Sequence, residues 1–244
     1  MGPRIIFEDQ DVCVIDKPAG MVVNRSQTST SDTVQQWHWA RLGEPAGQGE
    51  FYDKQGVVHR LDKDTSGVMV LAKTPGAYEG LKQQFLERKT KKTYLALVHG
   101  EMGEEQGIIS APIDRHPKDR MKFTVGGNKA AITEWRVVRR YLHPRGVPQA
   151  QHHPGGGLTL LSVEPHTGRT HQIRVHMKHL GHPIVSDPIY GGRKIHREDI
   201  KWCRRLFLHA KSLEFVHPGT GEKRLFESEL PDELVRVVKK LGRE

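Results

Sequence analysis

The sequence contains little cysteine: two residues, Cys13 and Cys203, in a chain of 244. They form no CxxC pair, so the pattern indicates neither a disulfide framework nor a cysteine zinc site. No apolar run reaches the length of about eighteen residues that a membrane helix needs. The N-terminal segment also lacks the continuous apolar stretch of a signal peptide. We therefore expect a cytoplasmic protein that contacts no membrane. A monomer is expected as well, without a sequence feature that specifies it.

The sequence also lacks the usual cofactor motifs. Its glycine cluster, "PGGGLTL", matches neither GxGxxG nor GxxxxGK[ST], so no dinucleotide or triphosphate site is indicated. We expect chemistry that needs no cofactor.

Basic residues outnumber acidic ones. Lysine and arginine total 38 against 29 acidic residues, which gives a formal charge of +9 and a pI near 9.6. This balance is typical of a protein that binds nucleic acid. Many basic proteins are merely soluble, however, so charge alone leaves both interpretations open.

The hydrophobic pattern predicts more strands than helices, without regular alternation. This favours an α+β fold with a mixed, mostly antiparallel central sheet flanked by helices. We expect a single domain over residues 1–244 with a flexible loop at 143–157, which is rich in proline, glycine and histidine. Strands are expected over residues 5–16 (two), 56–62, 66–74, 91–100, 107–110, 121–125, 131–141, 158–165, 206–218 and 223–230. Helices are expected over 33–42, 74–89, 170–181 and 232–244.

Several residues mark the helix ends and faces. Thr74 and Pro75 are typical of an N-cap and a first helical position, and Ser31 or Asp32 is expected to cap the helix at 33–42. In the two central helices, apolar residues recur at three- to four-residue spacing. The residues expected to face inward are Tyr78, Leu81 and Phe85, then Ile173, Met177 and Leu180.

The stretch "HRLDKDTSG", residues 59–67, concentrates charge between two apolar runs. On a strand, Arg60 and Asp62 would share one face. A carboxylate held at the end of a central strand beside a positive charge suits a nucleophile or a general base. The alternative is an ordinary surface turn closed by Thr65, Ser66 and Gly67.

Five histidines gather within residues 166–182. They are His166, His171, His176, His179 and His182. A metal site would need converging ligands, but no HExxH occurs and Asp187 is the one nearby acid, so we expect no metal. Phosphate contact is the better use of these side chains, alongside Arg169, Lys178 and Arg193.

The segment "HRLDKDTSGVMVLAKT" resembles the signature of the RluA-type pseudouridine synthases, with every position of the pattern HRLDxxTSG present. Further segments resemble other signatures of this family in its order and spacing, and together they cover nearly the whole chain. They are "IIFEDQDVCVIDKPAGMVV", "KKTYLALVHG", "EPHTGRTHQIRVHMKHLGHPIVSDPIYG" and "LFLHAKSLEFVHP". The resemblance implies the pseudouridine synthase fold. Because the pattern begins by residue 5, we expect no N-terminal S4-like RNA-binding domain.

The resemblance implies isomerisation of specific uridines in tRNA or rRNA to pseudouridine, without metal or cofactor. The expected absence of the S4-like domain favours a short stem-loop target, such as a tRNA arm. Asp62 matches the essential aspartate, which attacks the sugar or base or removes a sugar proton. Arg174 matches its carboxylate partner, Tyr94 the tyrosine that stacks on the uracil, and Arg60 the residue that takes the place of the flipped base. The remaining expected pocket residues are Leu208 and His209.

Two other functions remain open at this point. One is an RNA-binding protein of the same fold that has lost catalysis. The other is a metal-dependent nuclease that uses Asp62, Asp64 and the histidines.

Overall fold

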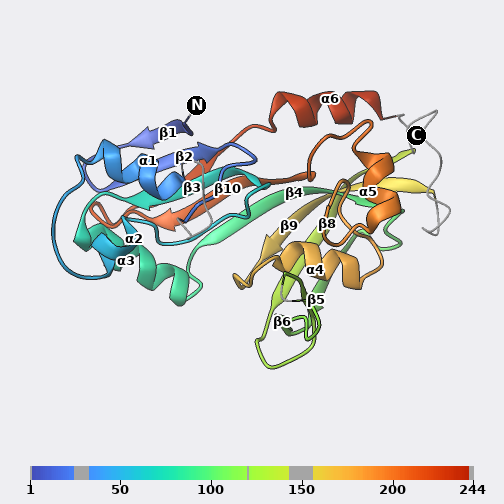
Figure 1. The fold of residues 1–244 in the computed structure, drawn as a ribbon, viewed down its shortest axis with the longest axis horizontal. Helices are drawn as coiled ribbons and strands as arrows, with labels where there is room; N and C mark the ends of the chain where they lie inside the picture. The colour runs from blue at the N-terminus through green and yellow to red at the C-terminus, as the bar shows by residue number, and fades with distance from the viewer. Residues whose placement is uncertain (1, 25–32, 120, 143–155, 242–244) are drawn as a thin grey trace. The chain divides into compact units, whose positions relative to one another are not determined.

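The computed structural model describes residues 2–24, 33–119, 121–142 and 156–241 (Figure 1). The chain divides into two compact units. The first comprises Met1–Lys92 and Ala210–Glu229, and the second Thr93–His209 and Leu230–Glu244. The expected flexible loop lies outside the described residues, apart from its last two positions. A single catalytic domain stays a prediction.

The first unit is built on antiparallel strands. β1 (Arg4–Glu8), β2 (Val12–Lys17) and β3 (Ser66–Ala72) form one ladder, in which Ile15 lies opposite Met69. β10 (Leu208–Val216) follows β3 in the sheet order and pairs with β11 (Lys223–Glu227). Every residue of β3 is buried, which explains why this strand is a continuous apolar run and does not alternate.

Three helices accompany these strands: α1 (Val34–Arg41), α2 (Glu50–Lys54) and α3 (Pro75–Leu86) (Figure 1). The side chain of Thr74 accepts a hydrogen bond from the Ala77 N–H and caps α3, as predicted. The cap of α1 is Thr33 and not Ser31 or Asp32, because Thr33 forms a reciprocal capping box with Gln36. In α3, Tyr78 and Leu81 are buried in the core of the unit.

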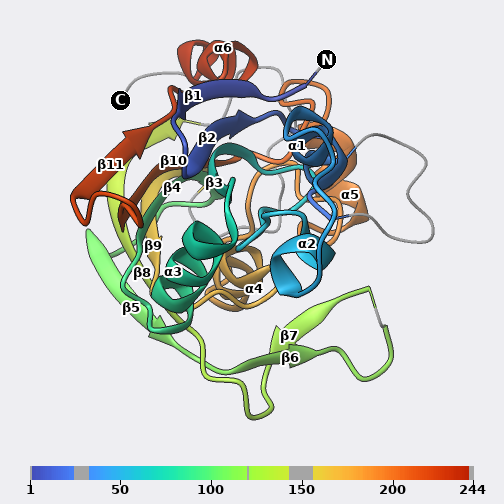
Figure 2. The same cartoon turned by 90° about the vertical axis from the view of Figure 1, so that its left-hand side faces the viewer.

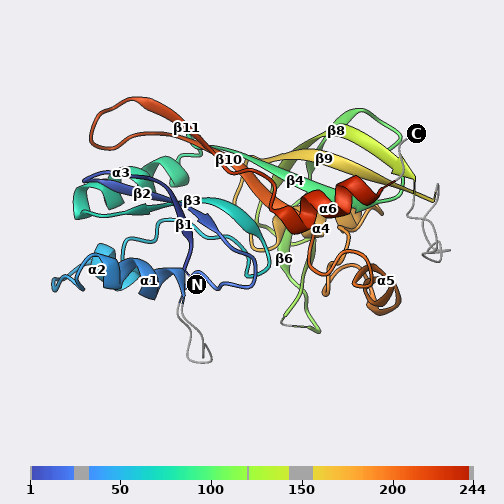
Figure 3. The ribbon, with the colours of Figure 1, turned by 90° about the horizontal axis from the view of Figure 1, so that it is seen from above.

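The second unit contains an antiparallel ladder in the order β4, β9, β8, β5. These strands are β4 (Lys91–His99), β9 (Gly157–Pro165), β8 (Ile132–Leu142) and β5 (Gln106–Ser110). Figure 3 shows β4, β9 and β8 side by side. β6 (Ile113–Arg115) and β7 (Phe123–Val125) form a separate hairpin (Figure 2).

The helices of this unit are α4 (Gln172–His179), α5 (Arg193–Asp199) and α6 (Asp232–Lys240). α4 packs on β7, β8 and β9 and buries Ile173 and Met177, as predicted. Leu180 is wrong as an inward residue, since it follows the last helical turn as the C-cap and is 38% exposed. α6 turns Leu234 and Val237 into the core of the unit.

Both units therefore combine mostly antiparallel strands with flanking helices, and the α+β prediction is confirmed. The strand expected over 56–62 is wrong: its one ladder contact is a bridge between Val57 and Leu71. The short elements α2, α5 and β6 were not predicted. None of the helices in the described residues is long and apolar enough to span a bilayer.

Candidate functional site

Asp62 lies on a loop of the first unit, between the Val57 bridge and β3. Its backbone carbonyl accepts a hydrogen bond from the Thr65 N–H at 3.1 Å, which closes a turn. Leu61 is buried, Asp62 is half-buried and Arg60 is exposed. Arg60 and Asp62 thus sit on a turn held by a buried leucine and not on one face of a strand.

A buried lysine holds this loop in place. Lys17, at the end of β2, is fully buried, and its Nζ donates to the carbonyl oxygens of Pro18 at 2.8 Å, Met21 at 2.9 Å and Lys63 at 3.1 Å. The Gly20 N–H donates to the same Lys63 oxygen at 2.8 Å. The segment after β2 is therefore tied to the residue next to Asp62.

The C-terminal end of the loop, where β3 begins, is held by the close approach of two strands. Gly67 has φ +117°, and a Cβ there would lie 2.2 Å from the Ala210 carbonyl oxygen of β10. Only glycine fits a position that combines a positive φ with such contact. The glycine of "TSG" is therefore required by the backbone packing of β3.

His59 has a structural role beside this loop. Its Nε2 accepts a hydrogen bond from the Val70 N–H at 3.1 Å, and its ring stacks on Phe85 at 4.4 Å between centroids. Burial, together with the nearby Lys92 ammonium, lowers the pKa of His59 to about 3. The ring is thus neutral at physiological pH, as an acceptor nitrogen requires.

Tyr94 belongs to the second unit. It lies on β4 opposite Val163 of β9, half-buried and packed against the core of this unit. Leu208 and His209, at the start of β10, are buried. Their predicted contacts with a uracil stay predictions.

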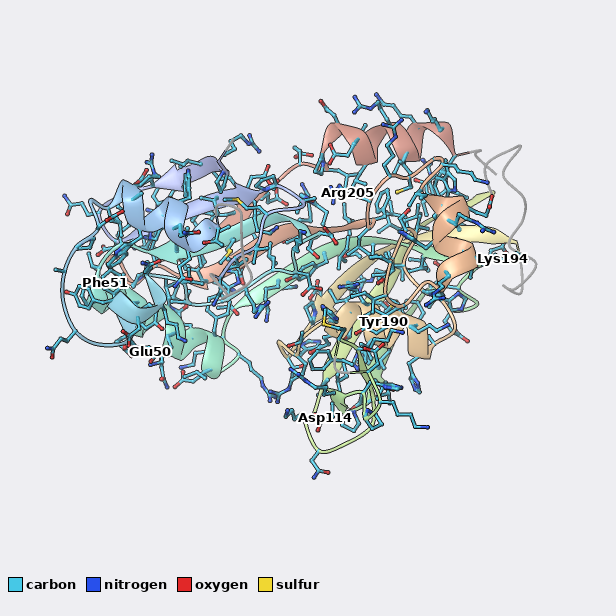
Figure 4. The ribbon with its side chains drawn as sticks, in the orientation of Figure 1. Glu50, Phe51, Asp114, Tyr190, Lys194 and Arg205 are labelled. Atoms are coloured by element: carbon cyan, nitrogen blue, oxygen red, sulfur yellow. The ribbon has the colours of Figure 1, made fainter. Side chains whose placement is uncertain are left out.

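Arg174 lies on α4, is 4% exposed and is paired with Asp187, which is fully buried. Its Nε donates to Asp187 Oδ2 at 2.8 Å and its Nη2 to Oδ1 at 2.9 Å. The guanidinium also lies 5.1 Å over the ring of Tyr190, which is labelled in Figure 4. Pairing with Asp62 stays a prediction, whereas the Asp187 partner was missed.

A family model described as "RNA pseudouridylate synthase" matches residues 11–179, which make up most of the chain. The chain belongs to this family.

Relatives and solved structures agree with the RNA pseudouridylate synthase assignment. An uncharacterized RNA pseudouridine synthase of Aquifex aeolicus is 41% identical over 238 residues, which cover 94% of this chain and 70% of the relative. The ribosomal large subunit pseudouridine synthase D of Nitrosomonas europaea is 39% identical over 242 residues, 96% of this chain and 64% of the relative. The structure of human RNA pseudouridylate synthase domain containing 1 has a TM-score of 0.72 and 26% identity, and the match covers 100% of this chain and 89% of the human one.

These findings confirm the RluA-type resemblance and its reaction class: this RNA pseudouridylate synthase is an isomerase of a family that acts on RNA. The matched segment contains Asp62, Tyr94 and Arg174.

The histidines of this pseudouridylate synthase have separate partners. His176 bonds Thr133 Oγ1 at 2.8 Å and the Ala111 carbonyl at 3.0 Å, and burial lowers its pKa. His176 is therefore a core histidine, and the prediction that it contacts phosphate was wrong. In the part of the chain that the structure describes, no three histidine, cysteine or acidic side chains form a group able to hold a metal ion.

The three basic residues expected to contact phosphate are all exposed on the second unit. Arg169 donates through Nε to the Ala130 carbonyl at 3.1 Å. Lys178 lies near the end of α4, and Arg193 begins α5. Each is placed where a polyanion could reach it, and the contacts stay predictions.

Lys17 and Asp187 are the residues that sequence reasoning missed. The signal for Lys17 was a lysine between a strand and the turn residues of "KPAG". The signal for Asp187 was "DPIY", since its carboxylate accepts from the N–H groups of Ile189 and Tyr190, both at 2.9 Å. An aspartate that organises its own turn in this way is a common local motif.

Proposed function

We propose that this chain converts specific uridines of structured tRNA or rRNA to pseudouridine, with the Asp62 carboxylate as the catalytic group. The observation that carries the proposal is the Asp62 loop. Asp62 is half-buried, and the loop is held at Lys63 by Lys17 and at its C-terminal end by Gly67. Such fixed positioning is what a group acting on one atom of a bound nucleotide requires.

The reaction rearranges the uridine without adding or removing atoms overall. The N1–C1′ bond breaks, the uracil turns, a C5–C1′ bond forms, C5 loses its proton and N1 gains one. Asp62 begins this sequence by attack on the sugar or base or by removal of a sugar proton. Both routes need an ionised carboxylate, since only that form carries the electron pair.

The other proposed roles serve a base that has left its stack. Tyr94 supports the face of the uracil, because an aromatic ring stabilises a flipped base. Arg60, exposed on the same turn as Asp62, occupies the gap that the base leaves. Arg174 balances the Asp62 charge, and Leu208 and His209 line the uracil pocket.

The names of several relatives favour one substrate for the first test. The relatives from Nitrosomonas europaea, Xanthomonas campestris and Pseudomonas aeruginosa are each called ribosomal large subunit pseudouridine synthase D. Large-subunit rRNA is therefore our first candidate, and a tRNA arm is the second.

The test measures pseudouridine in unmodified large-subunit rRNA and tRNA transcripts, in EDTA, with wild-type and Asp62→Asn proteins. Asparagine keeps the shape of the side chain and removes its charge. We expect turnover to fall at least about a thousandfold while RNA affinity changes less than about twofold.

Normal turnover by the Asp62→Asn protein would refute the catalytic role of Asp62. RNA binding without turnover by either protein on a full panel of cellular RNAs would instead favour the inactive RNA-binding protein. Strand cleavage abolished by EDTA would favour the nuclease.

A further inference from the structure

Lys92 differs from the comparable lysines of the chain. It is the second residue of β4, lies in the first unit and is half-buried. It has no hydrogen-bond or carboxylate partner among the described residues. Each of the other buried or half-buried lysines has an oxygen partner within 3.3 Å; they are Lys17, Lys73, Lys82, Lys122 and Lys211.

The surroundings of Lys92 are positive. Burial lowers the pKa of Lys92, and the positive charge of Arg88, four residues earlier in the chain, lowers it further. The acid of this turn, Glu87, already pairs with Lys89 at 2.6 Å. A half-buried ammonium without an acid costs free energy, so the site is suited to an anion that arrives with a ligand.

Arg88 itself occupies an unusual backbone position. It follows α3 with φ +60°, a position at which helices usually carry glycine. Placing an arginine there keeps a cation beside Lys92 despite the backbone cost. Strain of this kind often accompanies a functional side chain.

The positive site adjoins the Asp62 loop within the first unit. The His59 ring stacks on Phe85 in the last turn of α3, three residues before Arg88, and the Lys92 ammonium helps to lower the pKa of His59. His59 is three residues before Asp62 and next to the exposed Arg60. An anion bound by Lys92 would thus lie along the same segment as the proposed catalytic residue.

We propose that Lys92 and Arg88 bind one phosphodiester group of the substrate RNA strand that carries the target uridine. This inference rests on the proposed function, because it takes RNA as the ligand. The phosphate oxygens accept hydrogen bonds from the ammonium and the guanidinium, and the single negative charge of the phosphodiester offsets one of these two positive charges. The contact fixes the register of the strand on the loop and reads no base.

The test compares Lys92→Met with Lys89→Met. Both variants remove one positive charge from the same turn, but Lys89 is exposed and already paired with Glu87. Affinity for the large-subunit rRNA and tRNA transcripts is measured against salt in the Asp62→Asn background. Because this background has no turnover, the experiment measures RNA affinity alone. A failure of the phosphate contact can therefore be distinguished from a failure of the proposed catalytic function.

For Lys92→Met we expect affinity about tenfold lower at 0.1 M salt and a salt-dependence slope smaller by about one ion. For Lys89→Met we expect a change below about twofold, and Lys92→Arg should restore most of the affinity. The thermal midpoint of Lys92→Met should not fall, because the lysine has no structural partner to lose.

A chemical substitution in the RNA supplies a second measurement. Single neutral methylphosphonate linkages are placed in turn around the target uridine. One position should weaken binding to the Asp62→Asn protein about tenfold and have no further effect on the Lys92→Met form. Equal losses for Lys92→Met and Lys89→Met, a lowered thermal midpoint, or additive effects at every linkage would overturn the proposal.

Discussion

Arg174 and Asp187 form a buried ion pair with two hydrogen bonds in the second unit. Two further backbone N–H groups donate to the same carboxylate. Such a pair is favourable only while both charges are present, because each alone would be desolvated without compensation. The aspartate therefore holds the guanidinium that the proposed mechanism assigns to the active site.

We predict that Asp187→Asn lowers the free energy of unfolding by about 3–5 kcal/mol. Asparagine keeps the volume of the side chain but removes the buried negative charge that accepts two hydrogen bonds from Arg174. Urea denaturation measures the loss. The control is Asp119→Asn, which weakens a half-buried pair with Lys122 at 3.2 Å that solvent still reaches and should cost less than about 1 kcal/mol. A loss as small as that at Asp187 would show that the pair is not needed for stability.

At the scale of elements, the Asp62 loop is rigid because two other segments hold it. Lys17 joins the end of β2 to the Lys63 carbonyl, and Gly67 lets β3 meet the backbone of β10. Both determine where the loop that carries the carboxylate lies.

We predict that Lys17→Met lowers kcat about a hundredfold, since a displacement of about 1 Å in a catalytic group has an effect of this size. It should also lower the free energy of unfolding by about 2 kcal/mol, because buried carbonyl oxygens lose their donor. Pseudouridine formation and urea denaturation measure the two effects.

The matched control is Lys63→Met. The side chain of Lys63 is exposed and its backbone oxygen is the acceptor, so the anchor survives this substitution and kcat should change less than about threefold. If the two variants lost kcat equally, the anchoring role of Lys17 would be wrong.

At the scale of the whole molecule, the formal charge of +9 attracts the negatively charged RNA over long distances. Phosphate contacts release counterions, so affinity falls as salt rises. Catalysis on bound RNA depends on local geometry and should not share this dependence.

We predict that affinity for the rRNA transcript falls roughly a hundredfold between 50 and 200 mM salt, which corresponds to about four phosphate contacts, while kcat stays within about twofold. Lys178→Ala should reduce the slope by about one ion. Lys223→Ala is the control, because Lys223 pairs with Glu214 at 2.8 Å in the first unit. Salt-independent binding would contradict an electrostatic contribution to RNA recognition.

Local signals predicted much of the fold. Thr74 and Pro75 began α3 as expected, and the apolar run of β3 was recognised because burial on both faces leaves a plain composition signal. The prediction of a strand over 56–62 was wrong. The apolar and polar residues of this segment follow a strand-like pattern, but its one bridge to a neighbouring strand is at Val57. Pairing depends on a neighbouring strand, which a local pattern does not contain.

The sequence by itself determined the family and its reaction class, because "HRLDKDTSG" and the segments around it are ordered motifs that need no coordinates to be recognised. The tertiary structure alone decided which partners hold the functional side chains. Lys17 bonds a residue 46 positions away, and the nitrogen of His176 that meets Ala111 reaches across 65. Such contacts form where packing brings together segments that are distant in the sequence. Neither the periodicity of the sequence nor the type of a residue specifies which distant residue it will contact.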